Sequence, residues 1–513
     1  MLSTVYSAGL FGIDGFIVSA ECNARRDFSD FKLVGLPDLA VKEAQERVRT
    51  ACDNSGYKFP PVALMINLAP ADRKKEGSGF DVAILLGILR SGGYLNPELD
   101  LSKKCFVGEL SLSGKLRGVR GALCMCVAAK DAGFNELYLP AENAAEAAAV
   151  SGIDVYAVDS MKSLVDHLNG TAKMDPVRFD EAGFFASSTA RGPDFSDVRG
   201  QYMAKRAMEI AAAGGHNILL IGPPGTGKSM LAKRMPSILP PLTFEEAIET
   251  TKIHSVSGIL PEGVSLLSNR PFRSPHHTMS AVSLVGGGVN PRPGEISLAH
   301  NGVLFLDELP EFPKTVTDSL RQPLEDGRVT ITRAGGRVTY PCSFMLVAAM
   351  NPCRCGYFGD ETHKCTCRPD EVRKYISRIS GPLLDRIDIQ IELPTISYEE
   401  LASTAPGGET SAQVRERVVA ARRVAQERMS AERKIFCNAQ LDSATLRKYA
   451  KLDDGAYELL KKAYESLGLS ARGYDRTVRV ARTIADLAGS ESIGVPHVAE
   501  AIQLRSLDRK YWN

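Results

Sequence analysis

The chain has 513 residues, of which 24% are charged and 44% hydrophobic, an ordinary composition for a folded protein of about two to four domains. Its formal net charge of +1 excludes a strong overall field for nucleic acid, so any DNA binding must come from local patches. No apolar run is long enough to cross a membrane, and residues 1–6 lack the pattern of a signal peptide. We therefore expect a cytoplasmic protein without a membrane partner, whose eleven cysteines stay reduced.

Residues 1–168 alternate strand-like runs with helical patterns, which is typical of an α/β domain. Residues 169–193 lose this periodicity and gather Ser, Thr, Ala, Gly and Pro, so they predict a linker. The expected strands cover residues 16–19, 63–68 and 137–139, and the expected helices cover residues 39–55, 82–89 and 121–132.

Two segments of this first domain, residues 67–77 and 109–118, resemble the proteolytic domain of Lon-type proteases. The resemblance implies a nucleophilic serine two residues after Gly77 and a lysine early in the helix that follows Gly121. Gly79 occupies the first position, with Ser78 one step early, and residues 122–126 read ALCMC without a lysine. Because a Ser–Lys pair needs its base beside the hydroxyl, we expect Ser78 to be a turn residue in a Lon-like fold without protease chemistry.

A phosphate-binding loop follows in the next predicted domain, residues 194–395. An apolar run at residues 217–221 predicts a buried strand, and a helical pattern runs from Lys228 to Arg234, where Pro236 ends it. The glycines between them allow backbone N–H groups to surround an anion. Lys228 supplies charge for the ATP phosphates and the Ser229 hydroxyl can bind Mg²⁺. The expected ATP-binding residues are Gly222, Pro223, Pro224, Gly225, Thr226, Gly227, Lys228 and Ser229.

Two further apolar strands end in polar residues that suit hydrolysis. Residues 303–306 lead into Asp307 and Glu308, and the strand at residues 344–349 is followed by Asn351. The carboxyl ends of parallel strands are where ligands bind in open α/β sheets. We expect Asp307 to hold Mg²⁺ through water and Glu308 to act as general base. Asn351 would contact the γ-phosphate or the attacking water.

These parts resemble an AAA+ ATPase, a P-loop α/β core with a parallel sheet and helices on both faces. The resemblance implies that Arg386 is an arginine finger for the neighbouring subunit, although an Arg386–Asp388 surface pair is the alternative. It also implies that Arg472, with Arg476 as the runner-up, is the sensor-2 arginine. Residues 195–201, including Val198 and Gly200, resemble the segment that closes over adenine.

Five short stretches, at residues 216–217, 273–278, 293–302, 320–327 and 349–353, resemble the ComM/YifB family of magnesium-chelatase-like AAA+ ATPases. The resemblance covers essentially the whole chain. It implies an α-helical C-terminal lid over residues 396–513, a homohexameric ring, and ATP-driven branch migration of DNA in recombination and natural transformation. The alternative is a protein-remodelling ATPase that acts on a partner subunit, as the magnesium chelatase motor does.

Two inserts bear on DNA binding. Residues 328–340 alternate β-branched and polar residues around Ala-Gly-Gly, which predicts a hairpin with Arg333 and Arg337 beside its tip. Both arginines could contact DNA phosphates in the ring's pore, or could be solvated hairpin charges. Residues 284–288 could form a mobile pore loop. His276 and His277 lack a metal-ligand spacing, so we expect packing or substrate contact.

Four clustered cysteines, Cys353, Cys355, Cys365 and Cys367, form two C-x-C pairs that predict a structural Zn²⁺ site; unligated thiols are the alternative. The other seven cysteines show no metal spacing. Residues 413–434 are rich in arginine, and could contact nucleic acid or a neighbouring subunit or simply form a solvated helix face. These arginines are Arg415, Arg417, Arg422, Arg423, Arg428 and Arg433.

Overall fold

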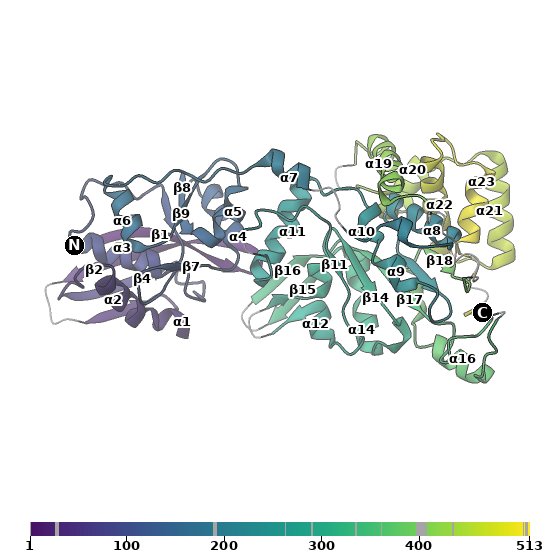
Figure 1. Ribbon diagram of the computed structural model, residues 1–513, viewed down its shortest axis with the longest axis horizontal. Coiled ribbons are helices and arrows are strands. Elements are labelled where there is room, and N and C mark those ends of the chain that lie inside the picture. The colour runs from purple at the N-terminus through teal and green to yellow at the C-terminus, as the bar shows by residue number, and fades with distance from the viewer. Residues whose placement is uncertain are drawn as a thin grey trace. The chain divides into compact units, whose positions relative to one another are not determined.

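The computed structural model describes residues 2–25, 30–187, 192–261, 263–288, 291–333, 336–360, 362–396, 408–432, 435–505, 507 and 511–512. The chain forms two compact units (Figure 1). The first contains Met1–Ala186 and Thr243–Ser268, and the second contains Ser187–Leu242 and Asn269–Asn513. Among the described residues, no helix is both long and apolar enough to cross a membrane.

The first unit is built on a seven-stranded mixed sheet in the order β3-β4-β2-β1-β5-β8-β9. Strands β1 and β2 pair in antiparallel fashion over their whole length, whereas β5, β8 and β9 run parallel. The bounds of these strands are β1 Leu2–Phe11, β2 Asp14–Arg25, β3 Phe31–Val34, β4 Ala63–Ala69, β5 Lys104–Phe106, β8 Glu136–Pro140 and β9 Asp154–Val158, and a small ribbon joins β6 Glu109–Leu110 to β7 Leu116–Arg117.

Helix α3 (Asp81–Ser91) lies in the core of this unit, since its residues from Asp81 to Leu89 are all buried. The long helix expected at residues 39–55 is interrupted at Glu43 and forms two helices. The segment expected to be a linker contains α7 up to Ser187, and residues 188–191 lie outside the described part of the chain. The remaining helices are α1 Leu39–Lys42, α2 Ala44–Asn54, α4 Ala122–Asp131, α5 Ala141–Ala148, α6 Met161–Leu168 and α7 Glu181–Ser187.

Helix α11 (Phe244–Ser257) belongs to the first unit although it follows the phosphate-binding loop in sequence. It packs against α4, and the N–H of Gly121 donates to the Ser255 carbonyl oxygen at 3.2 Å. The Ser255 hydroxyl also donates to the buried Glu146 carboxylate at 2.5 Å. Residues 243–268 therefore belong to the first unit, although the sequence predicted them within a single domain of residues 194–395.

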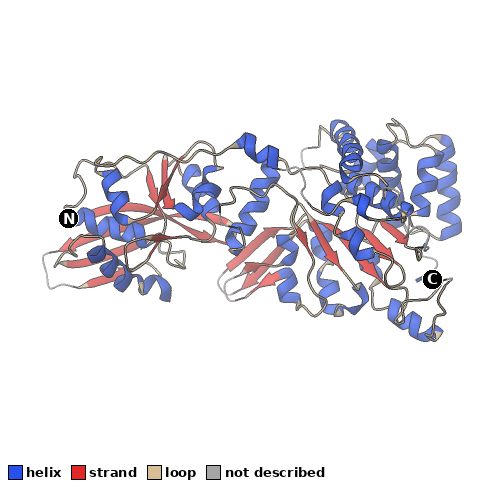
Figure 2. Cartoon of the chain, viewed as in Figure 1, coloured by secondary structure: helices blue, strands red, loops and turns tan. Residues whose placement is uncertain are grey.

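The second unit contains a five-stranded sheet in the order β11-β14-β17-β10-β18, in which every pairing is parallel (Figures 1 and 2). The predicted strands are confirmed within one or two residues at each end. All residues of β10, β14 and β17 are buried, as expected for continuous apolar runs in a parallel sheet. The bounds are β10 Ile218–Ile221, β11 Phe272–Arg273, β14 Val303–Leu306, β17 Met345–Met350 and β18 Ile389–Glu392.

One local expectation in this unit is wrong. Helix α9 spans Lys228–Ala232, and Pro236 does not end it but lies in the first turn of the next helix, α10 (Met235–Ile238). Proline fits there because the first turn of a helix leaves its N–H groups unpaired anyway. Two ribbons and several short helices complete this part: β12 Gly286–Gly287 with β13 Arg292–Pro293, β15 Arg328–Arg333 with β16 Gly336–Pro341, α12 Ala281–Val285, α13 Glu295–Leu298, α14 Lys314–Ser319, α15 Arg321–Asp326, α16 Pro369–Ile376 and α17 Gly381–Leu384.

The C-terminal helices share a hydrophobic core with the sheet. Helices α19 and α22 pack on α8, and His216 links the sheet to α22 through Asp388 at 3.2 Å and Thr483 at 2.8 Å. Residues 408–505 therefore form one compact unit with the five-stranded sheet. The helices are α8 Tyr202–Gly214, α19 Ser411–Arg428, α20 Ser443–Tyr449, α21 Asp454–Leu467, α22 Ala471–Leu487 and α23 Val495–Gln503.

Candidate functional site

The phosphate-binding loop lies where the strand order of the parallel sheet changes direction. Strand β10 has β17 on one side and β18 on the other, and residues 222–229 follow its carboxyl end. The N–H of Gly222 donates to the Met350 carbonyl oxygen at 3.2 Å, which ties the loop to β17. Gly225 and Gly227 have φ values of 82° and 88°, which favour glycine. This edge of an α/β sheet is the usual place for a ligand.

The Lys228 ammonium lies inside the loop. Its Nζ atom donates to the carbonyl oxygens of Gly222 and Pro223, both at 2.7 Å. Burial lowers the pKa of Lys228 to about 8, although the nearby Asp307 and Glu308 carboxylates oppose this shift. The lysine amine thus lies within the glycine loop, and its hydrogen bonds among the described residues go to backbone carbonyl oxygens.

The two carboxylates at the end of β14 differ in their surroundings. The Ser229 hydroxyl donates to Asp307 Oδ2 at 2.6 Å, which brings the two expected Mg²⁺ ligands together. Glu308 adopts a left-handed conformation with φ of 52°, and 54% of its side chain is exposed. His277 Nδ1 lies 3.5 Å from Glu308 Oε2. No local pattern predicts His277 beside this carboxylate, because 31 residues separate them.

Asn351 is half-buried just after β17, at the same edge of the sheet. Asn217, immediately before β10, lies at the opposite, amino-terminal end of these parallel strands. Its side-chain oxygen accepts from the Leu346 N–H at 2.8 Å, and its amide nitrogen donates to the Arg386 carbonyl oxygen at 2.8 Å. The sequence indicates Asn217 only as part of a stretch that resembles the family. In the structure its side chain bonds both to β17 and to the backbone of Arg386.

The Arg386 side chain is engaged within its own chain. Its guanidinium pairs with Glu325 of α15 and donates to the Pro382 carbonyl oxygen at 2.7 Å. The alternative pairing with Asp388 is wrong, because Asp388 is buried and accepts from His216 instead. Only 15% of the Arg386 side chain is exposed.

The two sensor-2 candidates occupy different environments on α22. Arg472 is exposed in the first turn. Arg476 is buried, and its Nε atom lies 3.5 Å from Asp388. Burial lowers the pKa of Arg476 to about 10. Burial would raise the pKa of Asp388, but the hydrogen bond from His216 and the nearby arginines outweigh it and lower that pKa. Arg476 is thus part of a structural charge cluster, and Arg472 is the candidate open to a ligand.

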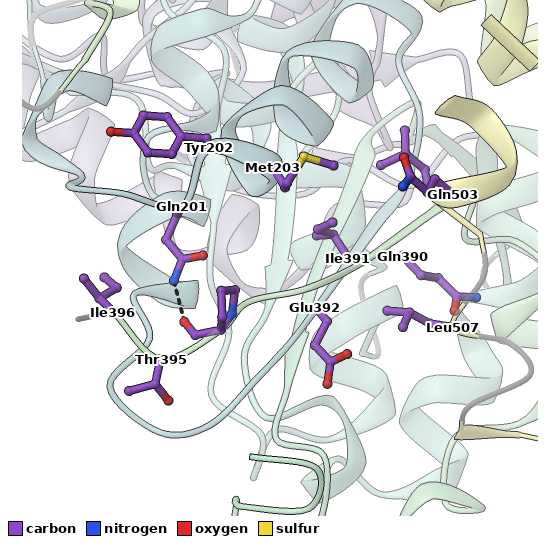
Figure 3. A pocket seen from close by; sticks show the side chains of 12 residues that line it. Gln201, Tyr202, Met203, Gln390, Ile391, Glu392, Thr395, Ile396, Gln503 and Leu507 are labelled. Atoms are coloured by element: carbon purple, nitrogen blue, oxygen red, sulfur yellow. Dashed lines mark hydrogen bonds between the residues drawn. The ribbon is translucent and has the colours of Figure 1, made fainter. Parts of the chain in front are cut away.

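A pocket of about 380 Å³ lies beside Gln201 at the start of α8 (Figure 3). Val198 and Gly200 are buried but do not line it; the next residues, Gln201 to Met203, do. The Gln201 side chain donates to the Thr226 carbonyl oxygen at 3.3 Å and to the Pro394 carbonyl oxygen at 2.8 Å, so it links the phosphate-binding loop to the pocket wall. The pocket is lined by Gln201, Tyr202, Met203, Gln390, Ile391, Glu392, Pro394, Thr395, Ile396, Gln503, Leu504 and Leu507.

The predicted hairpin is confirmed as β15 and β16, with its tip residues 334–335 outside the described part of the chain. Arg337 pairs in register with Thr332 on the exposed face, whereas Arg333 shares the face of the buried Ile331. The two arginines therefore lie on opposite faces of the hairpin.

The second insert lies beside the hairpin. A Cβ added to Gly287 of β12 would lie 3.5 Å from Arg333 Nη2, and the Tyr340 hydroxyl donates to the Pro291 carbonyl oxygen at 2.7 Å. Leu284 is fully buried, so the expected pore loop is anchored at its start. Residues 289–290 lie outside the described residues.

The four clustered cysteines come together in space. Their sulfur atoms all lie within 4.8 Å of one another, and all four are free thiols. The closest sulfur pairs are Cys353–Cys355 at 3.4 Å, Cys355–Cys365 at 3.5 Å and Cys353–Cys365 at 3.8 Å. The Cys355 N–H donates to Cys367 Sγ at 3.4 Å. Burial raises the pKa of Cys355, but backbone N–H donors outweigh it and lower that pKa to about 5. This set of soft donors can hold one metal ion.

Most arginines of the arginine-rich segment bind acceptors within the same unit. Arg422 donates to the carbonyl oxygens of Ala212 and Ala213 at the end of α8, and Arg417 pairs with Glu209 and Glu409. Arg428 pairs with Asp486, and Arg415 donates to the Ser237 carbonyl oxygen. Arg423 is exposed, and Arg433 lies outside the described residues. The charge of this helix thus serves mainly to hold α8 and α22.

Comparison with known proteins agrees with this geometry. Residues 194–401 match the family described as magnesium chelatase, subunit ChlI, residues 408–505 match the C-terminal part of that subunit, and residues 20–143 match the family described as subunit ChlI of Mg-chelatase. The chain is 45% identical over 514 residues to competence protein ComM of Haemophilus influenzae, covering 99% of this chain and 98% of that protein.

Two further proteins are similar to the chain at lower identity. The chain is 42% identical to the uncharacterized protein YifB of Escherichia coli, over 99% of this chain and 98% of YifB. It is 27% identical over 177 residues to the magnesium-chelatase 38 kDa subunit of Rhodobacter capsulatus, which covers 31% of this chain and 50% of that subunit. The chain belongs to the ComM/YifB family of magnesium-chelatase-like AAA+ proteins.

Proposed function

We propose that this protein is an ATP-hydrolysing motor that acts on branched or single-stranded DNA. The observation that carries the ATPase part is the meeting of Lys228, Ser229 and Asp307 at the carboxyl edge of the parallel sheet, with Ser229 hydrogen-bonded to Asp307 at 2.6 Å. In this proposal Lys228 binds the β- and γ-phosphates, and Ser229 and Asp307 hold Mg²⁺. Glu308, exposed at the end of β14, takes a proton from the attacking water.

Of the remaining catalytic roles, that of Arg386 requires a ring of identical subunits. Asn351 would contact the γ-phosphate or the attacking water in its own subunit. Arg386 would reach the γ-phosphate of the neighbouring subunit after exchanging its Glu325 partner for phosphate, and Arg472, exposed on α22, would contact the nucleotide as well. In a homohexamer of this kind, each subunit would receive Arg386 from its neighbour.

The base of ATP would lie against the segment that includes Val198 and Gly200 and extend toward the adjoining pocket. Gln201 supports this proposal, because its side chain bonds both to the phosphate-binding loop and to the pocket wall. Residues 408–505, which pack on α8, would act as the helical lid of the site.

The DNA part of the proposal comes from the relative named competence protein ComM and from the two inserts. A role in recombination during natural transformation, with branch migration as the activity, fits that name. Arg337 on the open face of the hairpin and Arg333 next to the Gly287 ribbon would contact DNA phosphates from two sides of the hairpin. The neutral net charge makes such local contacts necessary.

The tetrathiolate cluster would hold a structural Zn²⁺ ion. A tetrahedral centre with Zn–S bonds of about 2.3 Å places its sulfur atoms about 3.8 Å apart. The three shortest sulfur separations, 3.4 to 3.8 Å, lie close to this spacing, and all four sulfur atoms lie within 4.8 Å of one another.

The first unit would have a Lon-like fold without peptidase activity. Helix α4 begins with five buried residues, none of them lysine, and the Ser78 hydroxyl donates to the Glu109 carboxylate rather than to a lysine amine. We propose that this unit contributes to assembly or to substrate handling in the cytoplasm.

A protein-remodelling ATPase is the second candidate, favoured by the similarity to the magnesium-chelatase 38 kDa subunit. The ATPase rate with and without Holliday-junction DNA distinguishes the two. Several-fold stimulation by junction or single-stranded DNA, and loss of that stimulation in Arg337→Ala, supports the DNA motor. A rate that no DNA changes supports remodelling of a protein partner.

A further inference from the structure

The cysteine loop, residues 353–367, makes contacts with the nucleotide site that its metal chemistry alone does not require. Between β17 and α16, the described residues of this loop contain no helix and no strand. A segment without regular structure has few backbone bonds to fix its shape, so its conformation depends on its turns and on the cluster of thiols. The contacts that this loop makes with its neighbours therefore depend on the group that holds the four thiols together.

The first contact is with the phosphate-binding loop itself. Gly356, with φ of 93°, lies so close to Pro224 that an added Cβ atom would be 2.6 Å from Pro224 Cδ. Gly356 directly follows Cys355, and its N–H donates to the Cys353 carbonyl oxygen at 3.0 Å. The wall of the phosphate-binding loop at Pro224 is thus supported by the turn that carries two of the four thiols.

The second contact is with the pocket wall. The Thr395 hydroxyl donates to Asp360 Oδ2 at 2.7 Å, and Thr395 lines the pocket (Figure 3). Asp360 is held within the cysteine loop by the N–H groups of Thr362 and His363, at 2.8 and 2.6 Å. Hydroxyl donors from Thr362 and Thr395 lower the pKa of Asp360, so it remains an acceptor at neutral pH.

A third contact passes through the C-terminal end of the chain. The rings of Phe358 and Tyr511 lie edge to face, with centroids 6.4 Å apart. The Tyr511 hydroxyl donates to Glu392 Oε1 at 2.7 Å, and Glu392 also lines the pocket. Three residues within five positions of one another, Gly356, Phe358 and Asp360, therefore reach three parts of the nucleotide site.

We propose that the tetrathiolate centre, loaded with one zinc ion, acts as a brace that sets the affinity of the nucleotide site. The metal fixes the loop, and the loop holds Pro224, Thr395 and Glu392 in the positions that the bound nucleotide needs. This inference rests on the proposed function in assuming that nucleotide binds at the phosphate-binding loop and extends to the pocket that Thr395 and Glu392 line. The metal centre therefore has a positioning role. Without zinc the nucleotide site still exists, but nucleotide binding must also order the residues around the site, which lowers the affinity.

Variants that break the brace without touching a thiol give the most direct test. Thr395→Val removes the bond to Asp360, and Gly356→Ala forces Pro224 to move. Each should keep one zinc per chain by elemental analysis and raise the Kd of ADP roughly three- to tenfold. Gly56→Ala is the matched control, because Gly56 has a similar φ of 89° with nothing within 4 Å of an added Cβ. It should leave the Kd of ADP unchanged.

Removing the metal should have a larger effect of the same kind. Cys365→Ser with Cys367→Ser should lose zinc and weaken ADP binding about tenfold or more, with the far-ultraviolet circular dichroism retained. By linkage, ADP without Mg²⁺ should tighten zinc binding to the wild-type protein by the same factor, measured by competition with a chromogenic chelator. This second measurement uses the unaltered protein, so it decides the question even where a cysteine variant does not fold.

The outcomes separate this inference from the proposed function. Equal Kd values for ADP in the zinc-free and zinc-loaded protein, or a zinc affinity that ADP does not change, would overturn the brace. A wild-type protein that takes up no zinc would overturn it as well. If instead the zinc-loaded protein binds ADP no better than Lys228→Ala, the nucleotide site itself is misassigned.

Discussion

Each unit of this protein has, near a glycine turn, a serine hydrogen-bonded to a carboxylate and a lysine bound to backbone carbonyl oxygens. In the second unit, Ser229 donates to Asp307, and Lys228 donates to two carbonyl oxygens of the glycine loop. In the first unit, Ser78 donates to Glu109, and the buried Lys75 donates to the carbonyl oxygens of Pro70 and Arg73. The residue types are the same, yet the two arrangements differ in what they leave open.

The difference lies in the groups around each lysine. The carbonyl partners of Lys228 belong to a loop whose glycines allow the backbone to surround an anion. Beside this loop lies Asp307, the proposed Mg²⁺ ligand, which accepts from Ser229. The carbonyl partners of Lys75 close a local turn, and Glu109 is also within 3.7 Å of Arg117. Residue types that occur together are therefore weak evidence for chemistry until the acceptors around them are known.

The largest effect should come from the second unit's lysine. Lys228→Ala should abolish nucleotide binding and ATP hydrolysis, because no other cation is described inside the loop. Glu308→Gln should still bind ATP but turn it over roughly 10² to 10⁴ times more slowly, as expected for loss of a general base. Nucleotide binding by calorimetry and phosphate release check the two variants. Wild-type turnover by Glu308→Gln would show that Glu308 does not activate the water.

Arg386→Ala should reduce ATP hydrolysis by roughly 10³-fold or more in assembled rings, because a trans arginine stabilises the transferred phosphoryl group. Mixing Arg386→Ala subunits with Lys228→Ala subunits should restore part of the activity, since some interfaces then combine an intact loop with an intact arginine. Arg378→Ala is the control, an exposed arginine paired with Glu311. Intact mixed rings that stay inactive at every ratio would count against a role in trans.

The sequence predicted the second unit's site better than its surroundings, for a physical reason. The strands at residues 217–221, 303–306 and 344–349 are short apolar runs, and the polar residues that follow them lie at one sheet edge by geometry alone. The partner of Arg386 is Glu325, 61 residues earlier in the chain, and nothing local indicates that pairing. Helix α11 belongs to the first unit because it packs against α4, and the local sequence pattern does not predict this long-range contact either.

The arginine-rich segment shows the same limit. Its composition fits a nucleic-acid surface, and only the structure shows that Arg422 caps the end of α8 and that Arg417 pairs with Glu209. Unsatisfied carbonyl oxygens at a helix end are acceptors for such a side chain, just as phosphate oxygens are. A dense run of arginines thus predicts partners without saying whether they lie inside or outside the chain.

Asp388→Asn tests a carboxylate of the second unit that is structural rather than chemical. The substitution leaves the buried Arg476 without its counter-charge and should cost roughly 3 to 5 kcal/mol of the free energy of unfolding at neutral pH. The pKa of Asp388 is lowered in the fold, so its stabilisation is present above the pKa of the unfolded carboxyl and is lost as the pH falls. The difference between the variant and wild type in urea unfolding should therefore shrink in acid. A difference that is small at neutral pH would mean that Arg476 is not held by this charge.

The smallest effect is expected at Ser78 of the first unit, and it tests whether this serine has a chemical role. Ser78→Ala removes one hydrogen bond to Glu109, which Arg117 still faces, so the first unit should lose only about 1 kcal/mol of stability. ATP hydrolysis should stay at the wild-type rate. Neither protein should cleave an unfolded substrate such as casein, with or without ATP, because the Ser78 hydroxyl donates to a carboxylate and Lys75 is bound to backbone carbonyl oxygens. Cleavage by the wild type that Ser78→Ala abolishes and Lys75→Ala also abolishes would show that the two residues approach each other in the working protein, and that the first unit is a protease after all.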